Sequence, residues 1–177
     1  MLKDTPTSYG FITKLFHWTI GPIIIGLLIV GFVMANMEPS PEKYQLYPIH
    51  KAIGVTVLFL VTLRSLWRLS NGMVQLPPDI PAIIKICANI THFLQYVFMF
   101  LMPISGMLMS LYGGREISLF DLFIIPAFEK NDELADLFYN IHAKAAWLFV
   151  GTISLHILAA LYHHFIRRDN ILMRMIK

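Results

Sequence analysis

The sequence predicts an all-α integral membrane protein, a four-helix bundle in which residues 1–177 form one transmembrane domain. Hydrophobic residues make up 56% of the chain and charged residues only 14%, a composition typical of membrane proteins and not of soluble domains. In addition, four apolar stretches are each long enough to cross a bilayer core about 30 Å thick. We therefore expect membrane spans at residues 13–36, 47–70, 83–112 and 138–166.

The first two spans carry charges close to their ends. The first follows Lys3 and Lys14, but it is too long for the apolar region of a signal peptide and lacks a clear cleavage pattern, so we expect it to remain a span. The second has an uninterrupted apolar part only from Ala52 to Leu63, between Lys51 and Arg64. Both of these charges must reach the membrane surface or meet anionic partners. The third and fourth spans meet the length requirement directly.

The distribution of basic residues predicts the orientation in the membrane. If the spans alternate in direction, nine of the 14 Lys and Arg residues lie on the side that holds both termini. Because basic residues favour the cytoplasmic side, we expect both termini to be cytoplasmic. The opposite loops carry most of the acids, including Glu129, Asp132, Glu133 and Asp136. The net charge of +3 then reflects topology and attraction to anionic lipid, and it gives no reason to expect a nucleic-acid partner.

Four histidines lie at paired depths in the predicted bundle. His142 and His156 are fourteen residues apart on the last span, which places them on one helix face and roughly 21 Å apart along the axis. With alternating spans, His50 lies near the outer surface with His142, and His17 lies near the inner surface with His156. The pairs that can meet are therefore His50 with His142 and His17 with His156.

Each pair suits the two axial positions of a haem iron, since such sites are built from facing helices in bundle cores. We expect two haem b groups per chain, held without covalent attachment because the chain has one cysteine, Cys87, and no Cys-x-x-Cys-His motif. Zinc is a rival metal, but it prefers about four close nitrogen or sulfur ligands. A second alternative is that the histidines only form hydrogen bonds between helices. Polar side chains within the membrane are costly and usually have a function, so four such histidines favour metal binding over hydrogen bonding alone.

Small residues follow the four histidines at the spacing that stacks side chains on one helix face. A flat porphyrin lying along a helix needs such a missing side chain, although small residues are also common in membrane helices for packing. The residues four positions after the histidines are Gly21, Gly54, Ala146 and Ala160.

The sequence resembles the bacterial cytochrome b561 family over nearly its whole length. The resemblance is carried by His17-Trp18, by His50 followed by Gly54, by Pro103–Met107, by the spacing of His142 and His156, and by the ending Tyr162–Met175. It implies a di-haem four-helix protein of the bacterial inner membrane. Within the family the chain resembles the superoxide oxidases, which implies electron transfer from superoxide on the periplasmic side to ubiquinone in the membrane.

The outer end offers Lys51 and Lys144, each within two residues of a proposed ligand, as charges that attract the superoxide anion. Alternatively, these lysines only anchor helix ends or pair with haem propionates. Because two imidazoles leave the iron no open position, the haem would act as an outer-sphere electron carrier.

At the inner end, His163 lies seven residues beyond His156 on the same face, where it is placed to donate a proton to a quinone. His92 has a similar depth, and Trp18 is a further candidate for lining this pocket. Arg64 lies where the family places basic residues at the inner end of the second span. Interfacial anchoring explains His163, His92 and Trp18 equally well.

Two other functions remain open from the sequence. The chain could be a di-haem membrane anchor that passes electrons between a dehydrogenase or hydrogenase partner and quinone, with its outer surface as a docking face. It could also be a haem-free scaffold in which the histidines hold helices together.

Overall fold

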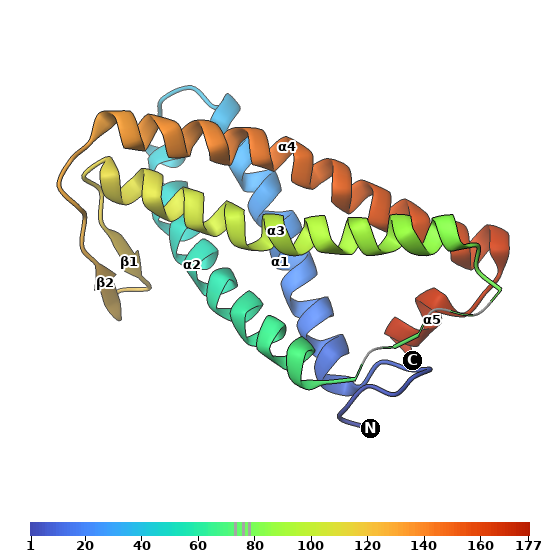
Figure 1. Cartoon of the computed structure of the whole chain (residues 1–177). Helices are drawn as coiled ribbons and strands as arrows, with labels where there is room; N and C mark the ends of the chain where they lie inside the picture. The colour runs from blue at the N-terminus through green and yellow to red at the C-terminus, as the bar shows by residue number, and fades with distance from the viewer. Residues whose placement is uncertain (73, 76, 78) are drawn as a thin grey trace.

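The computed structural model describes residues 1–72, 74, 75, 77 and 79–177, and its described part is dominated by four long helices (Figure 1). These are α1 (Phe11–Asn36), α2 (Pro41–Ser70), α3 (Ala82–Tyr112) and α4 (Asp132–Tyr162). The last continues into a π-helical turn, His163–Arg167, and is followed by the short helix α5, Ile171–Ile176. All four long helices are apolar enough to cross a membrane. The predicted all-α membrane four-helix bundle is confirmed.

Capping residues extend two helices beyond the apolar stretches that the sequence analysis used. The Ser40 hydroxyl accepts a hydrogen bond from the Lys43 backbone N–H, and the Asn131 side chain accepts one from the Leu134 backbone N–H. Helix α2 thus begins at Pro41, and α4 begins at Asp132. Both helices start with a polar turn because side-chain acceptors satisfy the first free backbone N–H groups.

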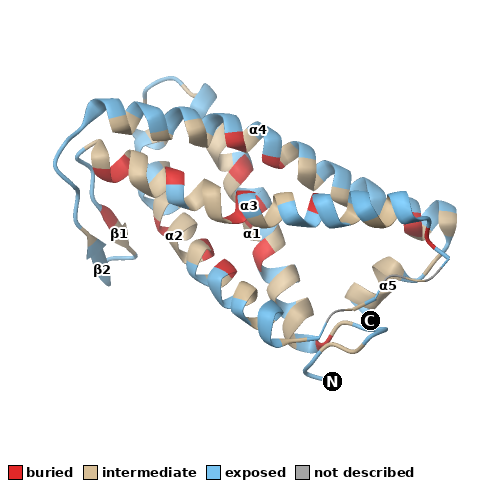
Figure 2. Cartoon of the chain, viewed as in Figure 1, coloured by how far each residue is buried: buried red, intermediate tan, exposed pale blue. Residues whose placement is uncertain are grey.

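The bundle core is a small cluster at mid-length. Helices α3 and α4 pack together, α1 packs on α2, and α2 packs on α3. The Phe98 and Phe149 rings lie 5.6 Å apart between α3 and α4. Buried residues are few and face the interior, whereas many large apolar side chains are exposed on the outer helix faces (Figure 2). That pattern is expected where lipid covers the surface. The buried core residues are Ile20, Ile24, Leu28, Val57, Val61, Phe98, Met99, Ala145 and Phe149.

A β-hairpin, which the sequence analysis does not predict, lies in the loop between α3 and α4. Strands β1 (Ile117–Leu119) and β2 (Phe123–Ile125) pair antiparallel. Their turn contains Phe120 and Asp121, both with positive φ (54° and 59°), as a type I′ turn requires. Ile117 is buried, and β1 contacts α2. The hairpin therefore closes one end of the bundle beside α2.

Both termini lie at the other end of the bundle (Figure 1). The indole N–H of Trp18 on α1 donates a hydrogen bond of 2.9 Å to the Met175 carbonyl of α5. The Phe11 backbone N–H donates to the Met1 carbonyl, so the N-terminal segment folds back on the start of α1. The N-terminal and C-terminal segments consequently form one surface.

Candidate functional site

Three histidines gather near the end of the bundle that holds the termini. The His17 ring on α1 and the His156 ring on α4 have centroids 6.1 Å apart. Because a bond between a metal and an imidazole nitrogen is about 2 Å long, a spacing of this size accommodates one metal atom between two rings. The structure thus brings together the two residues that the sequence analysis paired. It also places the His92 ring of α3 at 5.4 Å from that of His156.

Arg64 supplies a positive charge beside this histidine cluster. Its guanidinium carbon lies 5.6 Å from the centroid of the Tyr96 ring, a cation–π contact. The Arg64 charge acts on His17, His92 and His156. An anionic group bound among the histidines, such as a haem propionate, would find a cation within reach.

At the hairpin end, His142 on α4 is held by α3. Its Nδ1 lies 2.9 Å from the Met102 carbonyl oxygen and 3.1 Å from the Ser105 hydroxyl. Because a carbonyl oxygen can only accept, Nδ1 carries the hydrogen, and Nε2 keeps its lone pair. Histidines that bind metals typically donate their second ring N–H in this way.

His50 on α2 faces the same end and has a ring nitrogen without a partner. Its Nδ1 is buried and has no hydrogen-bond partner among the described residues. Leaving such a group unpaired costs about 1–3 kcal/mol. His142 is electrostatically coupled to His50, so the two rings lie near each other. A bound group between α2 and α4 would relieve the unpaired nitrogen.

Glycines leave room next to both histidine pairs. A Cβ atom added at Gly21 or Gly54 would meet nothing within 4 Å, so space lies open one turn after His17 and after His50. At Gly106 the opposite holds, because an added Cβ would lie 3.0 Å from Cε1 of His142. The open spaces fit a flat macrocycle beside the helices. The residues present therefore fit haem at both ends of the bundle.

Sequence reasoning missed the residues of α3 that hold His142. Ser105 and Gly106 belong to the Pro103–Met107 stretch, which was noted only for its family resemblance. A glycine and a hydroxyl within a membrane helix were the available signal, since small residues allow close approach between helices.

The two outer lysines differ in their surroundings. The Lys51 amine donates to the Glu116 carbonyl (2.7 Å) and to the Ser110 hydroxyl (3.2 Å), and so links α2 to the loop before the hairpin. The Lys144 side chain is exposed. Its amine makes no hydrogen bond or ion pair with any residue that the structure describes. Lys144 is thus the more available of the two charges.

The three residues predicted to line a quinone pocket, His92, His163 and Trp18, also differ in exposure and in contacts. His92 is exposed and lines a cavity of about 380 Å³ between α2 and α3, together with Ser65, Arg68, Leu69, Asn89, Phe93 and Tyr96. His163, in contrast, is only 8% exposed, and its Nδ1 lies 2.5 Å from Oδ2 of Asp169. Trp18 is half exposed and hydrogen-bonded to α5. Sequence reasoning missed Asp169, whose six-residue separation from His163 belongs to no regular helix spacing.

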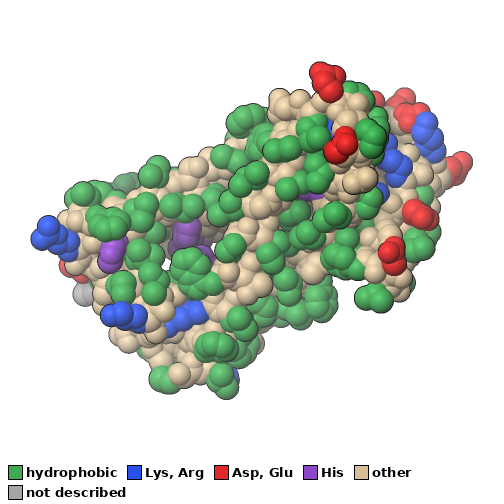
Figure 3. Space-filling view, turned by 180° about the vertical axis from the view of Figure 1, so that it is seen from behind, with side chains coloured by type: hydrophobic (Ala, Val, Ile, Leu, Met, Phe, Trp, Pro, Cys, Tyr) green, Lys and Arg blue, Asp and Glu red, His purple; other side chains and the backbone are tan. Residues whose placement is uncertain are grey.

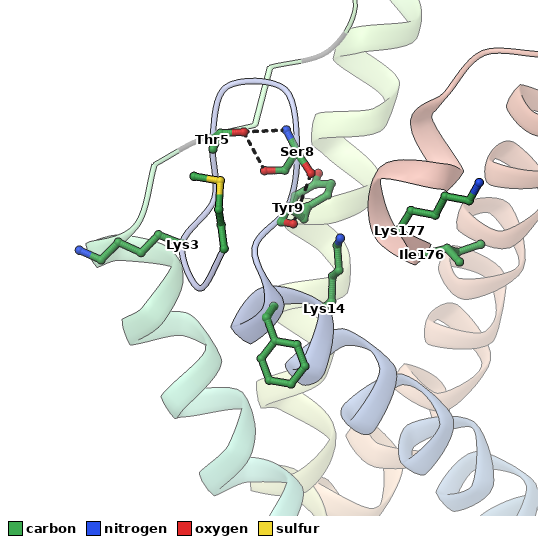
Figure 4. Close-up of a pocket in the computed structure, with 9 residues that line it drawn as sticks. Lys3, Thr5, Ser8, Tyr9, Lys14, Ile176 and Lys177 are labelled. Carbon is green, nitrogen blue, oxygen red and sulfur yellow. Dashed lines mark hydrogen bonds between the residues drawn. The ribbon is translucent and has the colours of Figure 1, made fainter.

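A second cavity, of about 370 Å³, lies where the N-terminal segment meets the start of α1 and the end of α5 (Figure 4). The side chain of Lys14 enters the space between these segments, while those of Lys3 and Lys177 extend to either side. No acidic residue of the described chain lines this cavity. A basic surface of this kind is typical of a membrane face that contacts anionic lipid.

The face of the molecule seen in Figure 3 is divided along the bundle. In Figure 3, hydrophobic side chains cover the middle of the molecule, and most acidic side chains gather at one end. Histidine side chains are visible in the other half, between hydrophobic groups. Of the three clustered histidines, His92 is exposed, whereas His17 and His156 are partly buried.

The chain is similar in sequence to several known proteins. A family model described as prokaryotic cytochrome b561 matches residues 8–177. Cytochrome b561 homolog 2 of Escherichia coli (strain K12) is 32% identical over 175 residues, covering 98% of this chain and 93% of the relative. "Probable superoxide oxidase CybB" of Yersinia pestis is 29% identical over 162 residues, covering 90% of each chain. Cytochrome b561 homolog 1 of Escherichia coli (strain K12) is 29% identical over 166 residues, covering 90% of this chain and 91% of the relative.

Proposed function

The chain belongs to the prokaryotic cytochrome b561 family, and from this premise we propose that it oxidises superoxide on the periplasmic side and reduces ubiquinone in the membrane. Membership makes it a multi-pass bacterial membrane protein that transfers electrons with haem b. The proposal adds that residues 1–177 form a single transmembrane domain with two haem groups. It also places the protein in the inner membrane, with both termini in the cytoplasm.

The observation that carries the proposal is the presence of two imidazole pairs, one beside each half of α4. His17 and His156 would hold the inner haem, and His50 and His142 would hold the outer haem. The 6.1 Å spacing of the inner rings, the unpaired Nδ1 of His50 and the open spaces at Gly21 and Gly54 support these assignments. When bound, each haem would supply a one-electron carrier held by the two imidazoles of its pair.

The protein's own residues set the orientation of these ligands and the charge around them. Met102 and Ser105 hold the His142 ring so that Nε2 is the atom available to a metal. Arg64 offers its charge to a propionate at the inner site. Both pairs lie between helices of the bundle.

Superoxide as the donor is supported by charge at the outer end and by the printed name of one relative. An anion does not need to touch the iron in order to transfer an electron. Lys144 has an exposed amine two residues from the proposed ligand His142, so it would attract the anion toward the outer haem. Lys51 would contribute less, because its amine already binds the loop before the hairpin.

Ubiquinone as the acceptor is supported by the inner cavity of about 380 Å³. That cavity lies next to the histidine cluster, since its lining residue His92 contacts His156. Arg68 and His92 offer donors to a quinone carbonyl, and Tyr96 and Phe93 offer aromatic surface. His163 would supply a proton from the cytoplasmic side.

One observation favours a second candidate function, that of a di-haem anchor for a soluble dehydrogenase or hydrogenase. The hairpin outside the spans exposes apolar side chains, with Phe120, Leu122 and Phe123 exposed by 58%, 89% and 62%. Such a patch on an extramembrane element is typical of a docking face. Co-purification of a stoichiometric partner, lost on Leu122→Ser, would favour this function.

The proposed function is tested by supplying superoxide to the purified protein, with and without a quinone. We expect haem reduction by superoxide alone, and steady quinol formation once a ubiquinone analogue is added. A superoxide scavenger should abolish both. Absence of haem reduction by superoxide, in protein that contains its haem, would exclude this donor.

A further inference from the structure

Directly after α4, the chain forms a buried imidazole–carboxylate pair to which the proposed electron transfer assigns no role. His163 opens a π-helical turn, and the chain then reverses at Arg168, which has a left-handed conformation (φ 56°). This reversal brings the Asp169 carboxylate back against the His163 ring, with 2.5 Å between Oδ2 and Nδ1. The His163 and Asp169 side chains are only 10% and 15% exposed.

Further contacts hold Asp169 in this place. Its Oδ1 accepts a hydrogen bond of 3.1 Å from the Ile171 backbone N–H, and Arg167 Nε lies 3.4 Å from Oδ2. Burial by itself raises the pKa of Asp169, but the hydrogen bonds from His163 and Ile171 and the charge of Arg167 together lower it below its ordinary value. The carboxylate is therefore ionised and acts only as an acceptor.

The ionised Asp169 carboxylate beside Nδ1 determines which nitrogen of the His163 ring can exchange a proton. Nδ1 must carry a hydrogen to donate to Asp169, so Nε2 is the nitrogen that can exchange protons with other groups. Among the described residues, only His50 Nδ1 and Asn71 Nδ2 are both fully enclosed and unpaired. Nε2 of His163 has no hydrogen-bond partner among these residues either, yet it does not belong to this enclosed set. This nitrogen is therefore accessible at the surface of the described chain.

The geometry points to Asp169 as a positioning residue that holds His163 in the state that donates a proton to the quinone. This inference rests on the proposed function, because it takes His163 as a proton donor at the inner site. The carboxylate fixes the orientation of the ring and neutralises its positive charge while both nitrogens are protonated. Carboxylates in this position serve the same two purposes in hydrolase triads.

The proton balance is complete with residues and solvent on the cytoplasmic side. Reduction of a quinone to a quinol takes two electrons, for which a haem held at the inner site would be the donor, and two protons. One proton leaves Nε2 of doubly protonated His163 and forms an O–H bond on the quinone. The ring stays neutral with its Nδ1 hydrogen on Asp169, and it regains the Nε2 proton from cytoplasmic water. The second proton also comes from water on that side.

The test compares Asp169→Asn with a variant of the same cluster that leaves His163 untouched. Arg167 also forms an ion pair of 3.0 Å with Asp79 in the connection between α2 and α3, so Asp79→Asn is the matched control. In chemically reduced protein, we measure haem reoxidation by a ubiquinone analogue. Asp169→Asn should slow reoxidation about tenfold or more, Asp169→Glu should recover most of the rate, and Asp79→Asn should stay within about twofold of wild type.

A spectroscopic readout separates positioning from folding. The wild-type protein should show a far-downfield Nδ1 proton signal, assigned by its loss in His163→Phe, and Asp169→Asn should lose that signal while both haem spectra persist. A wild-type rate in Asp169→Asn alongside slow His163→Phe would overturn the inference and leave the proposed function standing. A wild-type rate in His163→Phe would remove the proton donor from the proposed function itself. Slowing in Asp79→Asn, or no recovery in Asp169→Glu, would show that the cluster acts only through the fold.

Discussion

Nδ1 of His142 on α4 lies 2.9 Å from the carbonyl oxygen of Met102 on α3, across the most closely packed helix pair of the bundle. The approach is possible because Gly106, one turn further along α3, has no side chain to displace the imidazole ring. A ligand of the proposed outer haem is thus oriented by a helix that contributes no ligand of its own to that site.

This contact predicts that a side chain at Gly106 disturbs the outer haem and leaves the inner one intact. A Cβ there would lie 3.0 Å from Cε1 of His142, and the branched chain of Gly106→Val would extend further into the ring. We expect loss or weakening of one of two haem spectral components. Gly151→Val is the control, since an added Cβ there meets nothing within 4 Å. Two unchanged components in Gly106→Val would show that His142 does not ligate in the orientation described.

The proposed pairing of ligands predicts which substitutions have the same effect. His50→Ala and His142→Ala should each remove the outer haem, and His17→Ala and His156→Ala should each remove the inner haem. Difference spectra and redox titration of the four variants check this prediction. His92→Ala should keep both haems, although its ring lies closer to His156 than the His17 ring does. Loss of the inner haem in His92→Ala, with retention in His17→Ala, would reassign the ligand from α1 to α3.

Filling the open spaces beside the helices should exclude haem without removing a ligand. Gly21→Leu would project into the space beside His17, and Gly54→Leu into the space beside His50. We expect each variant to lose the haem of its own end, because a porphyrin edge cannot share that space with an isobutyl group. Haem content per chain checks the result, and full content in both variants would place the macrocycles elsewhere.

The four helices and the paired histidines follow from the sequence because hydropathy, length and helix periodicity fix them locally. The depth argument for His17 and His156 required only that successive spans run in opposite directions. The hairpin Ile117–Ile125 was missed because its strands are three residues long and its turn uses Phe120 and Asp121 at positive φ, where glycine or asparagine is the usual signal.

Contacts between distant residues could not be predicted in the same way. The contact of Met102 with His142 depends on how α3 and α4 pack, and the contact of His163 with Asp169 depends on a π-helical turn and a left-handed residue. Neither feature has a periodic signature. These tertiary contacts decide which nitrogen of each ring is free, and hence what the ring can do chemically.

The outer lysines predict a measurable effect of salt. Lys144→Gln should slow haem reduction by superoxide and weaken its dependence on ionic strength, because the removed charge is the one that salt screens. Lys51→Gln should change this rate less and should mainly loosen the hairpin, since its amine binds the Glu116 carbonyl and the Ser110 hydroxyl. Stopped-flow reduction at several salt concentrations measures both. An unchanged rate and salt slope in Lys144→Gln would contradict electrostatic attraction at this residue.

At the inner end, His92 lines the cavity between α2 and α3, whereas His163 is paired with Asp169. We expect His163→Phe to slow reoxidation of the haems by quinone about 100-fold, as the loss of a proton donor does. His92→Phe should instead weaken quinone binding, so that its rate recovers at high quinone concentration. Rates measured across quinone concentrations distinguish the two effects. Wild-type kinetics in both variants would place the quinone outside this region.

All of these predictions depend on the presence of two haem groups held by four histidines. The most direct test is the ratio of haem b to polypeptide in the purified wild-type protein, measured by the pyridine haemochrome assay with quantitative amino-acid analysis. Two haem b groups per chain, released without covalent attachment, is the predicted result. A ratio of one or zero, in protein that is otherwise folded, would contradict the account.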